Sequence, residues 1–350
     1  MAKATRPSAE EIILYEKNPK TKIATITFNR PEYLNAPTAA ARLRYSDLLY
    51  QAGVDDEVKV LVIRGVGEDF GSGADLPEFM ELQNADDDGP RLSEFRIAPG
   101  EVKYPPKGTF RRGASVGAWY ASPQSGIRTL QDFKKISILE VKGYCYGWHF
   151  YQAADADLVI SSDDALFGHP SFRYYGWGPR MWWWTQMMGV RKFQEMVYTG
   201  RPFTADEMYE CNFLNSVVPR ERLEDEVERY ALACARNRPT DTVFQQKMFF
   251  EVFKQFQGEY MGSLLGSCFE SMGGAAARDE DEFDMHEALG GGLAGAVKDN
   301  DSKFPPEWRL SKSGRKKAKI DIKAETTTKA KTKTPKTKAK TKTPKTKKKT

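Results

Sequence analysis

Two glycine-rich segments of this chain could each present a backbone N–H group to a reacting oxygen. One spans residues 65–76 and the other residues 142–151, and each lies between a strand-like run and a helix-like run. An N–H at a helix N-terminus stabilises negative charge through its hydrogen bond and through the helix dipole. The pair therefore predicts an oxyanion hole. Phe70 stands where a dinucleotide-binding GxGxxG motif needs its third glycine, which argues against a nicotinamide site.

Titratable side chains lie at or next to these segments. His149 and Tyr151 follow the second glycine turn, and His169 lies further along the chain. Histidine suits general acid–base chemistry because its ordinary pKa is near neutrality, but a single histidine beside a glycine turn is often structural. His149, His169 and His286 are the only histidines and have no ligand-like spacing, so no metal site is expected.

The elements that must position these residues follow from the hydrophobic pattern. The β-branched runs at 23–28, 58–63, 136–141 and 157–160 predict strands. Helical spacing predicts helices at 38–51 and from His149 onward, and then at 191–199, 204–211, 219–237, 240–256 and 259–272. The predicted fold class is therefore α/β, with a helical C-terminal region.

Three regions depart from this pattern. Residues 1–20 are expected to be an N-terminal extension before a domain at 21–290. Within that domain, residues 83–129 read as one long loop with scattered aromatic residues, which suggests a segment that folds over a site. Residues 291–350 are expected to form a disordered Lys-rich tail, in which AKTKTPKTK occurs twice in tandem.

Four stretches between about Ile23 and Leu289 resemble the crotonase superfamily, the enoyl-CoA hydratase/isomerase group. They are 23–36, ending in NRPEYLNA; 70–76, FGSGADL; the turn at 142–150; and 165–170, ALFGHP, followed by the similar segment 199–219. The resemblance implies a ββα spiral closed by C-terminal helices that build trimers or hexamers. It also implies an acyl-CoA substrate, with coenzyme A as part of the thioester and no further cofactor.

The resemblance assigns roles to individual residues. It implies that Ala74 and Trp148 donate the two N–H groups of the oxyanion hole. It implies that the coenzyme A is approached by residues of the first two motifs: Arg30, Asn35, Ala36, Gly73, Asp75 and Leu76. The further catalytic candidates are Tyr151, His169 and Ser171.

The chain departs from the family where a hydratase keeps its two glutamates. Tyr151 matches the first of these positions and Ser171 the second, with a one-residue shift to Phe172 if the alignment is made from Gly176. Water addition needs a base for the water and an acid for the α-carbon. Three alternatives stay open: a lyase of the hydratase or isomerase type acting on an unusual or bulky acyl group, retro-aldol or C–C hydrolysis, and a silent acyl-CoA-binding paralogue.

Composition limits the partners. Residues 311–350 contain 17 Lys and Arg against Asp321 and Glu325, which leaves the first 310 residues with 36 basic and 46 acidic groups. The tail therefore either solubilises the protein or binds nucleic acid and other polyanions without sequence preference. Four widely spaced cysteines, a polar start and no long apolar run predict a cytoplasmic protein without a membrane segment.

Overall fold

The structure is a computed structural model, and it describes residues 6–85, 89–106, 109–120, 130–174, 176–272, 283 and 292–315. The chain divides into two units, Met1–Asn300 and Asp301–Thr350. The first unit holds both glycine turns and all of the described sheet strands.

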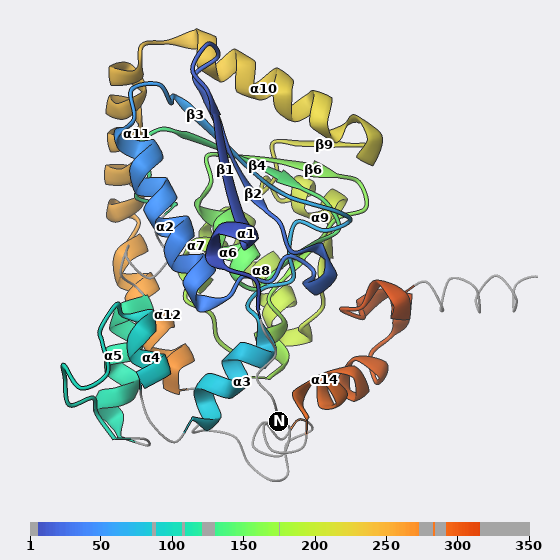
Figure 1. The fold of residues 1–350 in the computed structure, drawn as a ribbon. Helices are drawn as coiled ribbons and strands as arrows, with labels where there is room; N and C mark the ends of the chain where they lie inside the picture. Colours follow the sequence, from blue (N-terminus) through green and yellow to red (C-terminus); the bar gives the residue numbers. More distant parts are fainter. Residues whose placement is uncertain are drawn as a thin grey trace, which may run out of the picture. The chain divides into compact units, whose positions relative to one another are not determined.

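A six-stranded sheet forms the centre of the first unit (Figure 1). Its strands, in sheet order, are β1 (Ile13–Asn18), β2 (Ile23–Phe28), β3 (Val60–Gly65), β4 (Ile136–Val141), β6 (Leu158–Ser162) and β9 (Ser216–Val218). All neighbours are parallel except β1 and β2. A smaller sheet consists of β5 (Tyr144–Tyr146), β7 (Leu166–Gly168) and β8 (Phe203–Thr204). The prediction of an α/β fold is thereby confirmed.

Alternating side chains place the main sheet between two hydrophobic cores. Leu61 and Ile63 of β3 belong to a core shared with helix α2 (Ala39–Val54). Val60 and Val62 belong to a second core with helix α10 (Leu223–Asn237). Because successive side chains of a strand point to opposite faces, a strand buried on both faces needs an apolar run. This is what the predicted run at 58–63 supplies.

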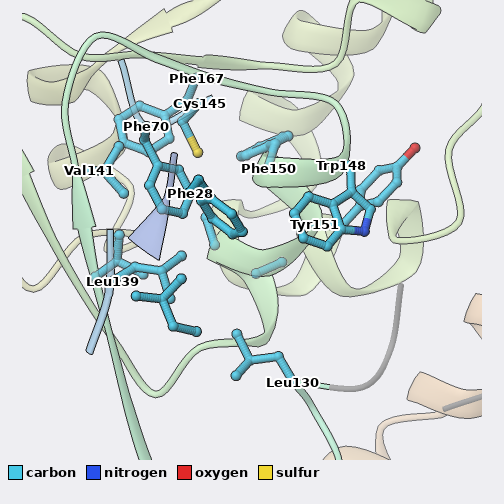
Figure 2. Packing of buried hydrophobic residues seen from close by; sticks show 14 of the residues in the cluster. Phe28, Phe70, Leu130, Leu139, Val141, Cys145, Trp148, Phe150, Tyr151 and Phe167 are labelled. Carbon is cyan, nitrogen blue, oxygen red and sulfur yellow. The ribbon is translucent and has the colours of Figure 1, made fainter. Parts of the chain in front are cut away.

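The larger core is rich in aromatic rings. Figure 2 shows Phe28, Phe70 and Cys145 in this core, and the rings of Phe28 and Phe70 meet edge to face with centroids 5.5 Å apart. Edge-to-face contacts of this kind add to the burial energy of the rings. Both glycine turns start directly from this packed region, so their backbones have a rigid base.

The N-terminal residues belong to the fold. Helix α1 (Ala9–Ile12) leads into β1, and Ile12 and Ile13 are fully buried. The prediction of an extension over residues 1–20 is therefore wrong for this part. Strand β1 was missed because its burial pattern shows only Ile13 inside and leaves no clear alternation.

The predicted loop at 83–129 contains three helical segments: the end of α3 (Leu76–Asn84), α4 (Gly89–Glu94) and α5 (Phe110–Tyr120). Residues 86–88, 107–108 and 121–129 of it lie outside the described part. Helix α5 packs closely against α12 (Glu259–Met272). A methyl group on Gly117 would lie 2.8 Å from the Cα of Cys268, so only glycine permits this approach. Part of the predicted loop is therefore a helix, α5, which packs on α12.

The other helices of the first unit lie where the sequence predicts them, except for α7, which was not predicted. They are α6 (Trp148–Asp155), α7 (Met181–Met188), α8 (Val190–Thr199), α9 (Ala205–Glu210) and α11 (Thr240–Phe256). Short 3-10 turns occur at Pro31–Tyr33, Pro170–Arg173, Arg220–Arg222 and Pro306–Trp308. In the part of the chain that the structure describes, no helix is long and apolar enough to cross a membrane. All four cysteines are unpaired.

The beginning of the expected tail is structured. Helix α14 spans Leu293–Ser302. In the second unit, Asp301 accepts hydrogen bonds from the backbone of Leu310 and Ser311 and from the Ser311 hydroxyl. The prediction of a disordered tail from residue 291 is therefore wrong for residues 293–315. The repeat at 330–347 lies outside the described residues.

Candidate functional site

The two glycine turns lie against each other. Gly71 and Cys145 form a parallel β-bridge, and the backbone N–H of Tyr146 donates to the carbonyl of Gly71 at 2.9 Å. Gly73 and Gly147 meet where the bridge ends, since a methyl group on Gly147 would lie 3.2 Å from the Gly73 Cα. Both glycines have positive φ, 107° and 55°. A side chain at either position would separate the turns.

Ala74 and Trp148 directly follow these paired glycines. A methyl group on Gly73 would lie 3.7 Å from the Trp148 nitrogen, which places the two predicted donors on adjoining backbone. Trp148 is the first residue of α6, so its N–H group lies at the N-terminal end of the helix, where the helix dipole favours negative charge. Within the described residues, no hydrogen bond uses the N–H of Ala74. This arrangement can accept one oxygen between two N–H groups.

His149 holds the first glycine turn in place through a hydrogen bond and through packing. Its Nδ1 accepts a hydrogen bond from the Gly73 N–H at 3.2 Å, and its ring fills the space beside Gly71. Complete burial lowers the pKa of His149 to about 3, so the ring stays neutral and Nδ1 remains an acceptor. Of the two histidines near the turns, His149 thus has the structural role that such a residue often has.

The residues expected to approach coenzyme A also hold the first turn. Arg30 donates to Asp75 at 2.6 Å and to the Ala36 carbonyl at 3.0 Å, and all three residues are buried. The Asn35 amide donates to the carbonyls of Val66 and Asp69. These side chains position the backbone that leads to Gly73.

Asp75 caps helix α3, which begins beside the oxyanion turn. Burial opposes ionisation of Asp75, but the Glu78 N–H and the Arg30 guanidinium outweigh it, so the pKa of the carboxyl is lowered. Leu76 follows it and is 47% exposed. Contact of these residues with coenzyme A stays a prediction. The six residues are Arg30, Asn35, Ala36, Gly73, Asp75 and Leu76, and within this set only Arg30 and Asp75 form an ion pair.

The Trp148 side chain is part of the core. Its indole lies edge to face with Phe28 and Tyr45, and Figure 2 shows it beside the aromatic cluster. Only its backbone can serve the site. Trp184, from the tryptophan run of α7, is fully buried and stacks on Phe150 with centroids 4.4 Å apart. Core packing is thus the role of both side chains.

Tyr151, His169 and Glu270 form a polar cluster one helical turn beyond Trp148. The Tyr151 hydroxyl lies 3.2 Å from His169 Nε2 and donates to Glu270 Oε1 at 3.4 Å. His169 Nε2 also lies 3.2 Å from the Trp177 carbonyl and 3.9 Å from Glu270 Oε1. Because a carbonyl can only accept, His169 Nε2 must carry the proton if it bonds to Trp177. The Tyr151 proton is then directed to Glu270.

Burial sets the titration of this cluster. It lowers the pKa of His169 to about 3, with the Trp177 carbonyl opposing the shift. It raises the pKa of Glu270 to about 8, and the hydrogen bond from Tyr151 opposes that rise. His169 is therefore neutral near pH 7, and the near-neutral pKa that is ordinary for histidine does not apply to it. Glu270 is the member that titrates near neutrality.

Ser171 stands apart from this cluster. It lies in the 3-10 turn that follows His169, and its carbonyl accepts from the N–H groups of Tyr174 and Gly176. Its hydroxyl makes no hydrogen bond to the described residues. Of the three predicted residues, the structure therefore brings Tyr151 and His169 together and leaves Ser171 without a contact to them. No group of three His, Cys, Asp or Glu among the described residues could hold a metal ion.

Glu270 was not among the predicted site residues. On α12, Ser263, Gly266 and Glu270 follow Glu259 at positions i+4, i+7 and i+11. These four residues therefore share one face of the helix. A carboxylate in line with glycine and serine on such a face is the signal that could have identified it. Small residues on a helix allow close packing, and a charged group among them must have a partner or a purpose.

A buried ion cluster attaches α12 to α6. The Arg180 guanidinium bonds to Asp155 of α6 and to Glu259 and Ser263 of α12. Arg180, Asp155 and Glu259 are at most 1% exposed. The same two helices carry Tyr151 and Glu270. Arg180 therefore fixes the relative placement of the elements that form the polar cluster.

Comparisons with known proteins identify the family of this chain. The family model for enoyl-CoA hydratase/isomerase matches residues 18–96 and 114–260. The chain is 27% identical over 226 residues to the mevalonyl-coenzyme A hydratase of Aspergillus fumigatus, covering 63% of this chain and 72% of that protein. It is 28% identical over 206 residues to the hydroxycinnamoyl-CoA hydratase-lyase of Pseudomonas fluorescens, covering 58% and 66%.

Solved structures show the same fold. An enoyl-CoA hydratase from Mycobacterium smegmatis superposes with a TM-score of 0.68 at 24% identity, covering 83% of this chain and 94% of that one. An enoyl-CoA hydratase/isomerase from Xanthobacter autotrophicus superposes with a TM-score of 0.63 at 24% identity, covering 84% and 98%. With a family model matching well over half of its residues, and with this fold, the chain belongs to the enoyl-CoA hydratase/isomerase family, the crotonase superfamily.

Proposed function

We propose that this protein transforms an acyl-CoA thioester through an enolate whose oxygen accepts hydrogen bonds from the N–H groups of Ala74 and Trp148. The observation that carries the proposal is the pairing of the two glycine turns, which brings Gly73 and Gly147 into contact directly before these residues. Two such donors stabilise the charge that develops on a thioester oxygen when a proton leaves or water adds. Membership of the enoyl-CoA hydratase/isomerase family supports the same chemistry.

The acyl group is proposed to be larger than a short straight chain. Two relatives are named for branched and aromatic acyl groups, mevalonyl and hydroxycinnamoyl. The insertion at residues 97–113 lies between the two segments that match the family model, and it leads into α5, which packs on α12. Hydration is the first candidate reaction. Retro-aldol cleavage is the second, since one relative is named a hydratase-lyase.

A panel of aliphatic, aromatic and alicyclic enoyl-CoA thioesters, read by mass spectrometry, tests the reaction. Hydration gives a product heavier by one water, whereas retro-aldol cleavage gives a shorter acyl-CoA and a carbonyl compound. No turnover of any member, with binding retained, would indicate the silent acyl-CoA-binding alternative.

The variant Ala74→Pro tests the oxyanion hole. It removes one donor, so kcat should fall about 10²–10³-fold. Ala74→Gly keeps the N–H and is the matched control, which should retain most of the activity. Circular dichroism checks that both variants fold. Full turnover in a folded Ala74→Pro protein would refute the assignment of this donor.

We also propose a homo-oligomer as the functional state. Helix α11 exposes aromatic side chains at helical spacing, with Phe249 66%, Phe253 51% and Phe256 89% exposed. Exposed apolar stripes of this kind are typical of protein interfaces. Trimers or hexamers of this chain would cover it, as expected from the family resemblance. The tail is proposed to bind polyanions outside the acyl-CoA site.

A further inference from the structure

The chain has no glutamate at the two positions where the family keeps its acid and base, but the polar cluster contains a carboxylate from elsewhere in the sequence, that of Glu270. Tyr151 stands at the position where the resemblance expects the first glutamate, and Ser171 at the second. The Glu270 carboxylate reaches the Tyr151 hydroxyl from a helix that begins 108 residues further along the chain, at Glu259, and it lies 119 residues away in sequence. Glu270 also lies beyond residue 260, where the match to the family model ends.

We propose that Glu270 is the acid–base residue of this site, with Tyr151 and His169 as positioning residues. The proposal rests on the proposed acyl-CoA function and names the group that moves the proton. Tyr151 lies one helical turn after Trp148, the first residue of α6. The Glu270 carboxylate, bonded to the Tyr151 hydroxyl, therefore contacts the first turn of α6, which also carries the proposed Trp148 donor.

The environment of Glu270 fits a working carboxylate better than a structural one. Its side chain is 20% exposed, and in the part of the chain that the structure describes no lysine or arginine forms an ion pair with it. By contrast, Glu259 on the same helix is fully buried and bonded to Arg180. A carboxylate enclosed without a cation costs stability, and proteins keep such groups mainly at functional sites.

Burial is the main cause of the raised pKa of Glu270, and among the described neighbouring groups only the Tyr151 hydrogen bond opposes it. Tyr151 of α6 and His169 of the β7 end face it directly. On α5, which packs against α12, Arg112 lies over the Tyr104 ring with 5.3 Å to its centroid and Arg111 is exposed. Helix α7 carries no ionisable Asp, Glu, Lys or Arg. No described cation therefore counteracts the rise in pKa.

One carboxylate can carry out the complete hydration. As a water oxygen bonds to the β-carbon, a water proton passes to the Glu270 carboxylate. The double-bond electrons then form the enolate, held by the N–H groups of Ala74 and Trp148. Glu270 next returns a proton to the α-carbon, and the carbonyl re-forms. The product contains one added water and Glu270 is again a carboxylate, so the step is balanced.

The variant Glu270→Gln separates this role from substrate binding. Phenylacetyl-CoA, whose α-hydrogens are acidic, is incubated in D₂O, and exchange at the α-carbon is followed by mass spectrometry. The exchange rate should fall about 10²-fold or more in Glu270→Gln. Glu228→Gln, an exposed carboxylate on α10, is the charge-matched control and should exchange as the native protein does.

A second readout does not depend on proton transfer. The absorption of bound cinnamoyl-CoA moves to longer wavelength when two N–H groups polarise its carbonyl. This shift should persist in Glu270→Gln and disappear in Ala74→Pro. Exchange at the native rate in Glu270→Gln, or no exchange in the native protein, overturns the role of Glu270. Loss of the spectral shift in the native protein would instead overturn the oxyanion hole.

Stability distinguishes a catalytic Glu270 from a structural one. The pKa of Glu270 is raised from 4.5 to about 8, so the stability that its neutral form confers is complete below pH 4.5 and is lost as the pH rises through about 8. Glu270→Gln should therefore unfold at a temperature at least as high as the native protein at pH 9. A clearly lower unfolding temperature at that pH would show a structural role and refute the proposal.

Discussion

Tyr151 is the residue through which the polar cluster is joined, because its hydroxyl contacts both His169 and Glu270. Its hydrogen bond to Glu270 lowers the carboxyl pKa against the rise caused by burial. Tyr151→Phe removes this bond and leaves the ring. The pKa that governs kcat/KM should therefore move upward from about 8, and the rate at pH 7 should fall, since less Glu270 is ionised.

A pH–rate profile of Tyr151→Phe and of His169→Gln checks this prediction. A merely structural change would reduce the rate at every pH without moving the midpoint. His169→Gln keeps an N–H donor for the Trp177 carbonyl, so its midpoint should stay near that of the native protein. A native profile that rises at pH 6–7, the ordinary range of histidine, would contradict the assignment and favour His169 as the base.

The sequence predicted those site residues that local patterns specify. The glycine turns, Ala74, Trp148, Tyr151 and His169 follow from spacing and resemblance, and the structure brings their segments together. The pKa of His169 could not be predicted, because it depends on how deeply the ring is buried. Glu270 was missed because its contact with Tyr151 is made only by the packing of two distant helices.

At the scale of elements, periodicity predicted the strands Ile23–Phe28 and Ile136–Val141 and the helices at 240–256 and 259–272 to the residue. It failed for β1, α5 and α7. Helix α5 contains two glycines and is recognisable only with its partner, because Gly113 and Gly117 pack on α12. Glycine disfavours an isolated helix, so tertiary contacts must compensate for it.

The contact between α6 and α12 depends on Arg180. Replacing it by methionine leaves Asp155 and Glu259 buried without their guanidinium partner. Arg180→Met should lower the free energy of unfolding by about 3–5 kcal/mol, and it should lower turnover because Glu270 loses its anchored helix.

Urea unfolding and turnover under native conditions measure the two effects of Arg180→Met. Arg229→Met is the matched control, because Arg229 is an exposed arginine paired with Glu226 within α10. It should change neither quantity appreciably. Equal stability of Arg180→Met and the native protein would show that the cluster does not hold the helices together.

At the scale of the whole molecule, opposite charges lie in different regions. Of the 17 basic residues after Leu310, 15 follow Arg315. Truncation after Arg315 keeps the hydrogen bonds of Asp301 and Arg309 and removes most of this charge. Turnover should remain, whereas salt-sensitive binding to DNA or heparin should be lost.

Fluorescence anisotropy with labelled DNA, measured over a salt series, checks the loss of binding in the truncated chain. Light scattering should give the same oligomer mass for both chains, since the aromatic stripe of α11 is retained. A large loss of turnover on truncation would place the tail in the acyl-CoA site. Unchanged DNA binding would place the polyanion site in the folded units.

Tyr151 and Glu270 are 119 residues apart, so the ribosome adds them to the chain at different times. Domains begin to fold from the N-terminus during synthesis. The main sheet and both glycine turns are complete once residue 218 has been made, so the growing chain can form the oxyanion turns before it contains α12. Until then the chain has two donors for an enolate but lacks the Glu270 carboxylate. On the proposed mechanism, the growing chain therefore gains its acid–base group only when α12 has been made.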